Sequence, residues 1–454
     1  MEKRNLLKIS ISGVRGIVGS SFTPDVACRF AQAFGASIGE GMVIVGRDTR
    51  PSGIMIQEAV HAGLQAAGCK PIDVGILPTP SILMNVRHRH AAGGICITAS
   101  HNPNEWNALK FINSQGIFLN RIQAAELLDI YNQEEFHTVG NAGIRSVRHL
   151  DDGFRIHQQR LEAFLDVEAI RKAGLRVAVD CCNGAASLYS VPFLESLGCT
   201  CFPLFADNSG IFPHPPEPTP ENVAQICEHV RKCKADIGFV QDPDADRLLL
   251  IDETGTPIVE DNTLVLATKY LLSKHPAGQT VVANLAISRA FDDVAKEAGA
   301  TCIHTAIGEI NVSEEIIAHN AIIGGEGNGG VIVPAVHPCR DSFVGMGLIL
   351  EAMATRGRTP GQLLREVPQY VMIKKKFDMS GGQIHRVLEG MRRHDWGGEV
   401  TVTTIDGLRL DWPDRWALIR SSNTEPVVRI AAEAKTKAGA EALIELLWKQ
   451  AMTF

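Results

Sequence analysis

The stretch GMVIVGRDTRPSGIMIQEAVHAGLQAAGCKPIDVG, residues 41–75, holds two β-branched runs separated by a polar turn and an amphipathic segment. The β-branched runs predict buried strands, and the amphipathic segment predicts a helix. Gly68 follows the helical segment, where a residue in the left-handed conformation commonly ends a helix. The stretch therefore predicts a β-α-β unit.

The same order of features occurs twice more, in residues 175–204 and 279–308, with helical segments that end near Gly198 and Gly299. The wide separation of these units along the sequence indicates duplicated domains, because the repeats of a solenoid are much shorter. Each unit is followed by another helical segment and a third strand that ends in a polar loop. The third strands are Ile95–Thr98, Ile237–Val240 and Ala321–Ile323. Because ligands bind at the carboxyl ends of such strands, the three loops predict one composite site shared by three domains.

The pattern changes from about Val371 onward and predicts a smaller α+β domain. Its expected elements are a helix near Gly381–Arg392, strands at Glu399–Thr404 and Trp416–Arg420, and a helix from Lys437. We therefore expect an α/β fold of three topologically similar mixed domains and a smaller C-terminal α+β domain. The expected domains are residues 1–152, 153–256, 257–370 and 371–454.

Composition narrows the functional classes. The chain has 454 residues, 45% of them apolar and 21% charged, which is typical of a globular protein. A net charge of -7 argues against a general nucleic-acid binder, which needs a basic excess. Eleven cysteines without a C-x-x-C pair indicate buried thiols in a reducing compartment. Without a targeting segment or an apolar stretch of bilayer length, we expect a cytoplasmic protein with no membrane or nucleic-acid partner.

The loop Asp242-Pro-Asp244-Ala-Asp246-Arg247 is the sharpest chemical signal in the sequence. Three carboxylates at every second position can converge on one cation, and oxygen ligands favour Mg²⁺, Mn²⁺ or Ca²⁺ over Zn²⁺. Arg247 could offset part of the negative charge or point at a substrate. The alternative is a solvated acidic turn.

A second loop, Thr98-Ala-Ser100-His101-Asn-Pro103, follows a predicted strand and presents a serine. A serine nucleophile needs activation by a base or a metal. We expect His101 to point away from Ser100, because adjacent side chains of an extended chain point apart. Lys110 lies in the strand-like NALKFIN and could direct a cation at the same site. The alternative is a plain turn.

The third loop, Gly325-Glu-Gly-Asn-Gly-Gly330, matches G-x-G-x-x-G, but a strand rather than a helix follows, so we reject a dinucleotide site. Glu326 and Asn328 have the donors and acceptors that bind sugar hydroxyls. The alternative is a glycine-rich hairpin.

A fourth loop, Arg420-Ser-Ser-Asn-Thr-Glu-Pro426, precedes Arg429. Hydroxyls, an amide, backbone N–H groups and arginines suit a phosphate. A solvated turn is again the alternative. The sequence contains no G-x-x-x-x-G-K-[ST] motif, so an ordinary P-loop nucleotide site is not expected.

Together the four motifs TASHNP, DPDADR, GEGNG and RSSNTEP, in this order, resemble those of the α-D-phosphohexomutase superfamily. The resemblance also includes Gly13-Val-Arg15-Gly16 and Gly46-Arg47-Asp-Thr-Arg50, and it covers essentially the whole chain. It implies four domains around a central cleft, of which the first three are alike. It further implies that hexose 1- and 6-phosphates are interconverted through a 1,6-bisphosphate.

The resemblance implies a role for each matching position. Ser100 matches a phosphoserine, whose phosphate would join Asp242, Asp244 and Asp246 as ligands of Mg²⁺. The expected catalytic residues are Ser100, His101, Lys110 and Arg15. The expected substrate-binding residues are Arg247, Glu309, Glu326, Asn328, Arg420, Ser422, Asn423, Thr424 and Arg429. The implied cofactors are Mg²⁺ and a hexose 1,6-bisphosphate as activator and intermediate; the implied partners are small sugar phosphates, and the chain is expected to be a monomer or homodimer.

The third loop departs from the family pattern. Many members read Gly-Glu-x-Ser-Gly-His there, whereas this chain has Asn328 and Gly330, and many have His or Lys where Glu309 stands. His337 or Arg340-Asp341 are the candidates to compensate. Glu326 and Glu309 could meet an ammonium group, which favours glucosamine phosphate. Phosphomannomutase or phosphoglucomutase activity is the alternative, followed by a metal-dependent sugar phosphatase and a non-catalytic sugar-phosphate binding protein.

Overall fold

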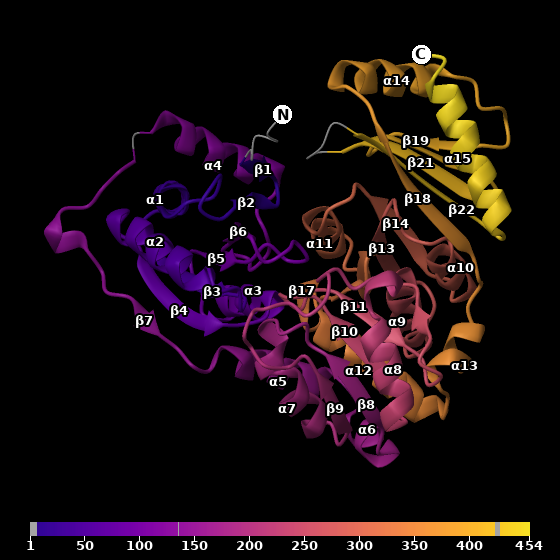
Figure 1. Ribbon diagram of the computed structural model, residues 1–454, viewed down its shortest axis with the longest axis horizontal. Coiled ribbons are helices and arrows are strands. Elements are labelled where there is room, and N and C mark those ends of the chain that lie inside the picture. Colours follow the sequence, from indigo (N-terminus) through magenta and orange to yellow (C-terminus); the bar gives the residue numbers. More distant parts are fainter. Residues whose placement is uncertain (1–6, 135, 423–426) are drawn as a thin grey trace. The chain divides into compact units, whose positions relative to one another are not determined.

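A computed structural model describes residues 7–134, 136–422 and 427–454. The chain divides into two compact units. Figure 1 labels the helices and strands and colours them by residue number. The first comprises Met1–Thr263 and Asn328–Gln362, and the second comprises Leu264–Gly327 and Leu363–Phe454.

The first sheet is formed by the N-terminal part of the first unit. Its strand order is β1-β2-β6-β5-β3-β4-β7. The strands are β1 (Lys8–Ser10), β2 (Gly13–Ile17), β3 (Met42–Arg47), β4 (Lys70–Ile76), β5 (Gly93–Ile97), β6 (Trp106–Asn113) and β7 (Arg148–His149). Strand β3 pairs in parallel with β4 and β5, and the helix between β3 and β4 ends before Gly68, whose φ is 82°. The β-α-β unit predicted for residues 41–75 is confirmed.

Helices surround this sheet and build its core. They are α1 (Pro24–Ile38), α2 (Gly53–Ala66), α3 (Thr79–His88) and α4 (Arg121–Gln133), with the short η1 (Asn141–Gly143). Helix α1 begins at Thr23, whose side chain accepts from the Val26 N–H, so the first turn is capped. Phe30 and Phe34 of α1 pack against Phe111 of β6. This apolar packing holds β6 in place, and β6 carries Lys110.

A second sheet in the first unit has the order β12-β11-β10-β8-β9. Its strands are β8 (Arg176–Asp180), β9 (Thr200–Leu204), β10 (Ile237–Gln241), β11 (Leu248–Ile251) and β12 (Pro257–Ile258). Its helices are α5 (Gly153–Phe164), α6 (Val167–Ala173), η2 (Ala185–Leu188), α7 (Ser190–Ser196), η3 (Pro220–Asn222) and α8 (Ala224–Cys233). Strand β8 pairs in parallel with β9 and β10, which confirms the second β-α-β unit.

The first unit also contains the hairpin of β16 (Gly330–Val333) and β17 (His337–Arg340), followed by α12 (Ser342–Arg356). Buried His157 of α5 joins these parts: its Nδ1 hydrogen-bonds to Ser81 Oγ of α3 at 2.8 Å. Its Nε2 hydrogen-bonds to Asp341 Oδ2 at 2.7 Å, directly before α12. The turn after β17 is therefore fixed to two helices far away in sequence.

The second unit begins with three parallel strands and their helices. The elements are β13 (Thr280–Asn284), β14 (Thr301–Thr305), β15 (Ile323–Glu326), α10 (Ala290–Glu297) and α11 (Glu309–Ala318), preceded by α9 (Asp261–Ser273). Strand β13 pairs in parallel with both β14 and β15, and Gly299 after α10 has a φ of 66°. The third β-α-β unit is confirmed.

The C-terminal part of the second unit is an antiparallel sheet with the order β18-β22-β21-β20-β19. Its strands are β18 (Val371–Asp378), β19 (Thr401–Thr403), β20 (Leu408–Asp411), β21 (Trp416–Ser421) and β22 (Val427–Ala434). Helices α14 (Gly381–Arg393) and α15 (Lys437–Ala451) pack on it, and α13 (Pro360–Arg365) precedes it. The predicted α+β character of this region is confirmed.

Polar contacts join this sheet to the parallel strands of the same unit. Glu433 Oε2 accepts from the backbone N–H of Arg289 and from Trp416 Nε1, both at 2.8 Å. Arg409 is buried, stacks on the Trp416 ring and donates to the Leu285 carbonyl. These contacts join the start of β21 and the end of β22 to the segment between β13 and α10.

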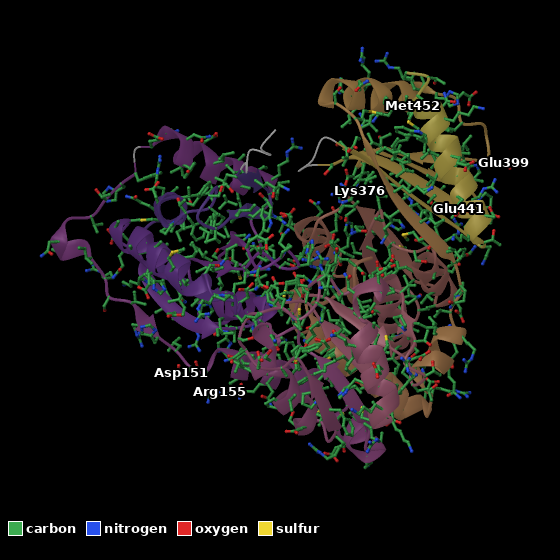
Figure 2. All side chains as sticks on the ribbon, viewed as in Figure 1. Asp151, Arg155, Lys376, Glu399, Glu441 and Met452 are labelled. Atoms are coloured by element: carbon green, nitrogen blue, oxygen red, sulfur yellow. The ribbon has the colours of Figure 1, made fainter. Side chains whose placement is uncertain are left out.

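Charged side chains such as Asp151, Arg155 and Glu399 lie at the surface (Figure 2). All eleven cysteines are free thiols, most of them buried, and burial raises the pKa of Cys181 and Cys199. Of the helices that the structure describes, none combines the length and apolar character needed to cross a bilayer.

Candidate active site

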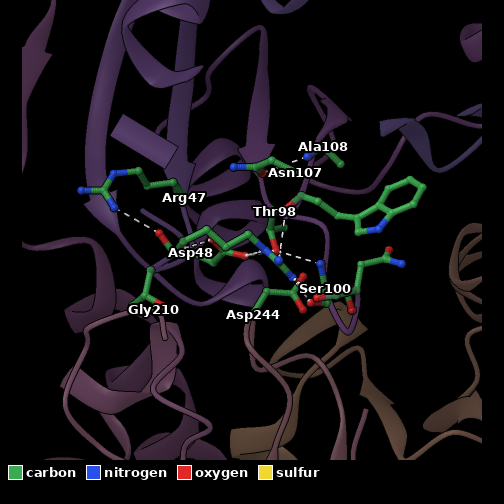
Figure 3. A network of polar contacts seen from close by, with 12 residues as sticks. Arg47, Asp48, Thr98, Ser100, Asn107, Ala108, Gly210 and Asp244 are labelled. Carbon is green, nitrogen blue, oxygen red and sulfur yellow. Dashed lines mark hydrogen bonds and ion pairs between the residues drawn. The ribbon is translucent and has the colours of Figure 1, made fainter. Parts of the chain in front are cut away.

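The serine loop follows β5 and has an unusual backbone. Ser100 has a φ of 48°, in the left-handed region that residues other than glycine seldom adopt. Its N–H donates to Thr98 Oγ1 at 3.0 Å, and Thr98 Oγ1 donates to Asp48 Oδ2 at 2.6 Å (Figure 3). Such strain persists only where the surroundings enforce it and is frequent at functional sites.

Arg50 is the residue that enforces this backbone, and the sequence interpretation gave it no role. Its side chain is fully buried and pairs with Asp48 at 3.0 Å. Its guanidinium donates to the Ser100 and Asn102 carbonyls at 2.6 and 2.7 Å, and to those of Pro103 and Trp106. The motif Gly46–Arg50 could have pointed to Arg50, but that motif served only to support the family resemblance.

The acidic loop follows β10 and folds back on itself. Asp242 Oδ1 accepts from the backbone N–H groups of Asp246 and Arg247 at 3.1 and 3.2 Å. Ala245 has a φ of 59°, and its carbonyl accepts from Ser342 Oγ at 2.7 Å. The turn is therefore held from inside and from the start of α12.

The two loops meet at their key side chains. Ser100 Oγ donates to Asp242 Oδ2 at 2.8 Å, although 142 residues separate the two in sequence. Ser100 is 6% exposed, and all three aspartates of the loop are 1% exposed or less. The predicted convergence of a serine and three carboxylates is thus present in the geometry, and these carboxylates are not a solvated turn.

In Asp244 and in Asp246, one carboxylate oxygen accepts a hydrogen bond from a positively charged side chain. Lys110 Nζ donates to Asp244 Oδ2 at 2.7 Å, and Thr79 Oγ1 donates to the same atom at 2.9 Å. Arg340 Nη2 donates to Asp246 Oδ2 at 2.5 Å. Oδ1 of Asp244 and of Asp246 are buried and have no hydrogen-bond donor among the described residues. The Arg247 Nε atom lies 3.8 Å from Asp246 Oδ1, which is an ion-pair distance but too long for a hydrogen bond.

These two oxygens give a test of metal binding. Buried carboxylate oxygens without a donor are costly unless a cation meets them. One carboxylate oxygen from each of Asp242, Asp244 and Asp246 lies within 4.8 Å of the others. An oxygen-only set of this charge fits a hard divalent cation such as Mg²⁺. The residues present therefore fit the group that the resemblance implies.

Burial and mutual repulsion shift the pKa values of these groups. Burial, with the charges of Asp244 and Asp246, raises the pKa of Asp242 well above its usual range. Burial raises the pKa of Asp244, but the Lys110 charge and the hydrogen bonds that Asp244 makes, including those from Lys110 and Thr79, together lower it by more, so the net direction is downward. Burial likewise lowers the pKa of Lys110, and its two aspartate partners raise it by more. The pair is therefore ionised.

The expectation that His101 points away from Ser100 is wrong. His101 Nδ1 lies 3.3 Å from Ser100 Oγ, because the positive φ of Ser100 breaks the alternation of an extended chain. The Arg247 charge, burial and the Arg15 charge lower the pKa of His101 to about 2. The imidazole is therefore neutral.

Two arginines expected at the site lie in the same region of the first unit. Arg15 of β2 faces Ala108 of β6, so it lies diagonal to Lys110 on one face of the sheet. Burial and the Arg247 charge lower the pKa of Arg15. Arg247 lies 3.8 Å from Asp246 and 3.4 Å from Glu217.

The sugar-loop and phosphate-loop residues lie mostly in the second unit. Glu326 Oε1 accepts from Asn284 Nδ2 at 2.8 Å and from the Gly308 N–H at 3.0 Å. Glu309 begins α11 and is buried. Burial lowers the pKa of Arg420, and the charge of Glu326 is among the groups that act on it.

The rest of the phosphate loop is partly described. Arg420 faces Arg429 across β21 and β22, and the Ser422 N–H donates to the Val427 carbonyl at 3.0 Å. Asn423 and Thr424 lie outside the described residues. Asn328 belongs to the first unit, and its Oδ1 accepts from the Gly330 N–H at 3.3 Å.

His337, Arg340 and Asp341, the candidates to compensate for the altered third loop, have different partners in the structure. Buried His337 hydrogen-bonds through Nε2 to the Gly116 carbonyl, and Asp341 hydrogen-bonds to His157. Both therefore have structural partners. Arg340 alone of the three reaches the acidic loop.

A further group of possible metal ligands, Asp292, Cys302 and His304, lies in the second unit. Its members are partly exposed and bonded to one another, with His304 Nε2 at 2.8 Å from Asp292 Oδ1.

The first unit thus brings together a strained serine, three buried carboxylates, a neutral imidazole and several cations. This arrangement suits metal-assisted transfer of a phosphoryl group to and from a hydroxyl, for which charge neutralisation and positioning matter most.

Comparisons with known proteins agree with that class. Four domain families of the phosphoglucomutase/phosphomannomutase type match in order: the α/β/α domains I, II and III at residues 7–138, 156–255 and 260–370, and the C-terminal domain at 386–448. The chain belongs to the phosphoglucomutase/phosphomannomutase family, with three α/β domains and a smaller C-terminal domain, and is a phosphohexomutase.

Relatives match over nearly their whole length. A phosphoglucomutase/phosphomannomutase of Thermococcus kodakarensis is 37% identical over 443 residues, 96% of each chain. A probable phosphoglucosamine mutase of Methanopyrus kandleri is 34% identical over 445 residues, which is 95% of each chain. A crystal structure of a phosphoglucomutase/phosphomannomutase family protein from Burkholderia thailandensis has a TM-score of 0.83 at 29% identity, covering 98% of this chain and 97% of that one.

Proposed function

We propose that the protein interconverts hexose 1-phosphates and 6-phosphates through phospho-Ser100, with glucosamine 6-phosphate and glucosamine 1-phosphate as the preferred pair. The observation that carries this proposal is the 2.8 Å hydrogen bond from Ser100 Oγ to Asp242 Oδ2, beside two buried carboxylate oxygens without donors. A nucleophilic oxygen and a cation site at this distance suit covalent phosphoryl transfer.

In the first half-reaction, a sugar hydroxyl attacks the phosphorus of phospho-Ser100 and the bond from phosphorus to Oγ breaks. The hydroxyl proton ends on Oγ, which restores the donor that now binds Asp242. The bisphosphate then turns around. In the second half-reaction Oγ attacks the other phosphorus, the bond from that phosphorus to the sugar oxygen breaks, and the Oγ proton ends on the sugar oxygen. Atoms and charge balance over the cycle, so no phosphate is released.

The surrounding side chains have separate tasks in this scheme. A cation held by Asp242, Asp244 and Asp246 would supply positive charge to the transferring phosphoryl oxygens. Lys110 and Arg15 add positive charge and, as the resemblance implies, assist proton transfer. His101 is neutral and 3.3 Å from Oγ, so it can orient that atom without adding charge.

The two ends of the substrate would be held by the remaining candidate residues. We assign the non-reacting phosphate to the loop with Arg420 and Arg429, because arginine forks suit phosphate. That loop also contributes Ser422, Asn423 and Thr424. Arg247, Glu326, Glu309 and Asn328 are assigned to the sugar.

The preference for an amino sugar rests on two acidic residues. Glu326 and Glu309 are buried in the second unit and would favour an ammonium group. The name of the Methanopyrus kandleri relative is in keeping with this choice, whereas that of the Thermococcus kodakarensis relative supports mannose and glucose phosphates as the alternative. We also propose the division at residues 152, 256 and 370.

A coupled assay tests the proposal. The purified chain is incubated with Mg²⁺, a trace of hexose 1,6-bisphosphate and the 1- or 6-phosphate of glucosamine, glucose or mannose. We expect interconversion, fastest with glucosamine phosphate. Sustained release of inorganic phosphate would instead indicate a phosphatase, and binding without turnover would indicate a sugar-phosphate binding protein.

A further inference from the structure

The hairpin of β16 and β17 sends one charged side chain to the acidic loop. Arg340, the last residue of β17, lies 2.5 Å through Nη2 from Asp246 Oδ2, and its side chain is 10% exposed. Arg340 and Asp246 are 94 residues apart in sequence. A buried charge-assisted hydrogen bond of this length restricts both side chains.

Gly330 makes the room that this side chain needs. A Cβ built on Gly330 would lie 2.9 Å from Cγ of Arg340 and still closer to its Cδ. Gly330 lies two residues before Ile332, the strand partner of Arg340, so the two are diagonal neighbours on one face of the hairpin. Its φ lies outside the left-handed region, so its backbone conformation alone does not require glycine. The lack of a side chain at 330 and the path of Arg340 are therefore linked.

The contact with Arg340 determines which carboxylate oxygen of Asp246 is left to bind a cation. Arg340 binds Oδ2, and Oδ1 remains buried without a hydrogen-bond donor among the described residues. Asp244 shows the same division, since Lys110 and Thr79 bind its Oδ2 and leave its Oδ1. Hydrogen bonds to the outer oxygen of a ligating carboxylate orient the inner one.

We propose that Arg340, admitted by the missing side chain of Gly330, is a positioning residue that fixes Asp246 for a divalent cation. The inference rests on the proposed function, in which Asp242, Asp244 and Asp246 bind that cation. This proposal explains the altered third loop. At position 330, where many members of the family have histidine, glycine leaves the space that the Arg340 side chain occupies.

A double-mutant cycle on the full-length protein tests this coupling. Mn²⁺ affinity is measured by electron paramagnetic resonance and by calorimetry for the wild type, Gly330→Ala, Arg340→Met and the double variant. We expect each single change to weaken Mn²⁺ binding about 10-fold or more, the range seen when partners of metal ligands are lost. The double variant should bind no more weakly than Arg340→Met, because Gly330→Ala acts only by displacing Arg340.

Two further variants separate positioning from a general loss of structure. Arg340→Lys should recover part of the affinity, because an ammonium can still donate to Asp246 Oδ2. Gly140→Ala, at an exposed glycine with open space around it, should leave Mn²⁺ binding unchanged. Thermal unfolding identifies any variant that does not fold. If Arg340→Met does not fold, Gly330→Ala and Arg340→Lys still test the role of Arg340.

The outcomes distinguish this inference from the function on which it rests. Unchanged Mn²⁺ affinity in Gly330→Ala, additive losses in the double variant, or no Mn²⁺ binding by the wild type would each overturn the role of Arg340. If the wild type binds Mn²⁺ and the cycle is non-additive, but no hexose phosphate is converted, the proposed mutase activity fails while the positioning role stands.

Discussion

The guanidinium of Arg50 donates to the backbone carbonyl of Ser100 at 2.6 Å and so holds the proposed nucleophile in a left-handed conformation. The same guanidinium binds the carbonyls of Asn102, Pro103 and Trp106, and its charge is matched by Asp48. The strain at Ser100 is therefore compensated by the buried Arg50 side chain together with the hydrogen bond from the Ser100 N–H to Thr98 Oγ1.

Arg50→Lys should damage both stability and turnover. Lysine keeps the charge but has three rotatable donors in place of a planar fork, so several of these carbonyls lose their donor. We expect the free energy of unfolding to fall by about 2–4 kcal/mol, and turnover to fall at least about 10-fold as Ser100 loses its geometry. Urea unfolding and the mutase assay measure the two effects.

The matched control for Arg50→Lys is Arg89→Lys. Arg89 also pairs with an aspartate, Asp152, but its side chain is 21% exposed and that of Asp152 is 39% exposed. We expect this partly exposed pair to contribute about 1 kcal/mol or less. Equal losses of stability in the two variants would contradict the role given to Arg50.

Ser100→Ala should abolish turnover and leave the fold intact. The change removes only the hydroxyl that donates to Asp242, so the free energy of unfolding should change by about 1–2 kcal/mol at most. Turnover should fall by about 10³-fold or more, since the covalent route is lost. Incubation with ³²P-labelled hexose bisphosphate should label the wild type and not the variant.

Ser187→Ala serves as the control for Ser100→Ala. Ser187 Oγ is buried and has no hydrogen-bond partner among the described residues, so its removal changes a serine without touching the site. Phosphate incorporation and turnover should match the wild type. Labelling of Ser100→Ala at the wild-type level would show that another residue carries the phosphoryl group.

Local patterns in the sequence predicted the three β-α-β units, because strand and helix periodicities depend on neighbouring residues. They also placed Ser100 and Asp242 at strand ends, and strand ends converge in this fold. Arg50 was given no role, and Arg340 was named only as one candidate to compensate for the third loop, because their partners, Ser100 and Asp246, are distant in sequence.

The expected orientation of His101 failed for a different reason. The alternation of side chains holds for extended backbone, and the positive φ of Ser100 interrupts it. That φ is imposed by hydrogen bonds from Arg50 and to Thr98, neither of which the local sequence pattern reveals.

A histidine away from the proposed site should make stability depend on pH. His214 Nε2 lies 3.1 Å from Asp180 Oδ2 at the end of β8. Burial lowers the pKa of His214, but the hydrogen bond to Asp180 and its charge raise it by more, so the net direction is upward. The folded pKa therefore exceeds the unfolded value of about 6.5.

The sign of the pH effect follows from this difference. A raised histidine pKa stabilises the fold fully below about pH 6.5, and this contribution is lost as pH rises through the folded pKa. The difference in unfolding free energy between the wild type and His214→Asn should thus be larger at pH 5.5 than at pH 8.5. Urea unfolding at both values measures it, with exposed His137→Asn as control. A difference that grows with pH would contradict the assignment.

Arg420→Ala should weaken substrate binding more than it weakens the fold. Arg420 Nη1 donates a long hydrogen bond of 3.5 Å to the Ser421 carbonyl, whereas buried Arg409 pairs with Asp411 at 2.8 Å. A charged hydrogen bond to phosphate is worth about 1.5–3 kcal/mol, so KM for the sugar phosphate should rise about 10- to 100-fold. Thermal unfolding should shift little in Arg420→Ala and much more in Arg409→Ala. An unchanged KM in Arg420→Ala would remove Arg420 from the phosphate site, because a bound phosphate could not lose that partner without a loss of affinity.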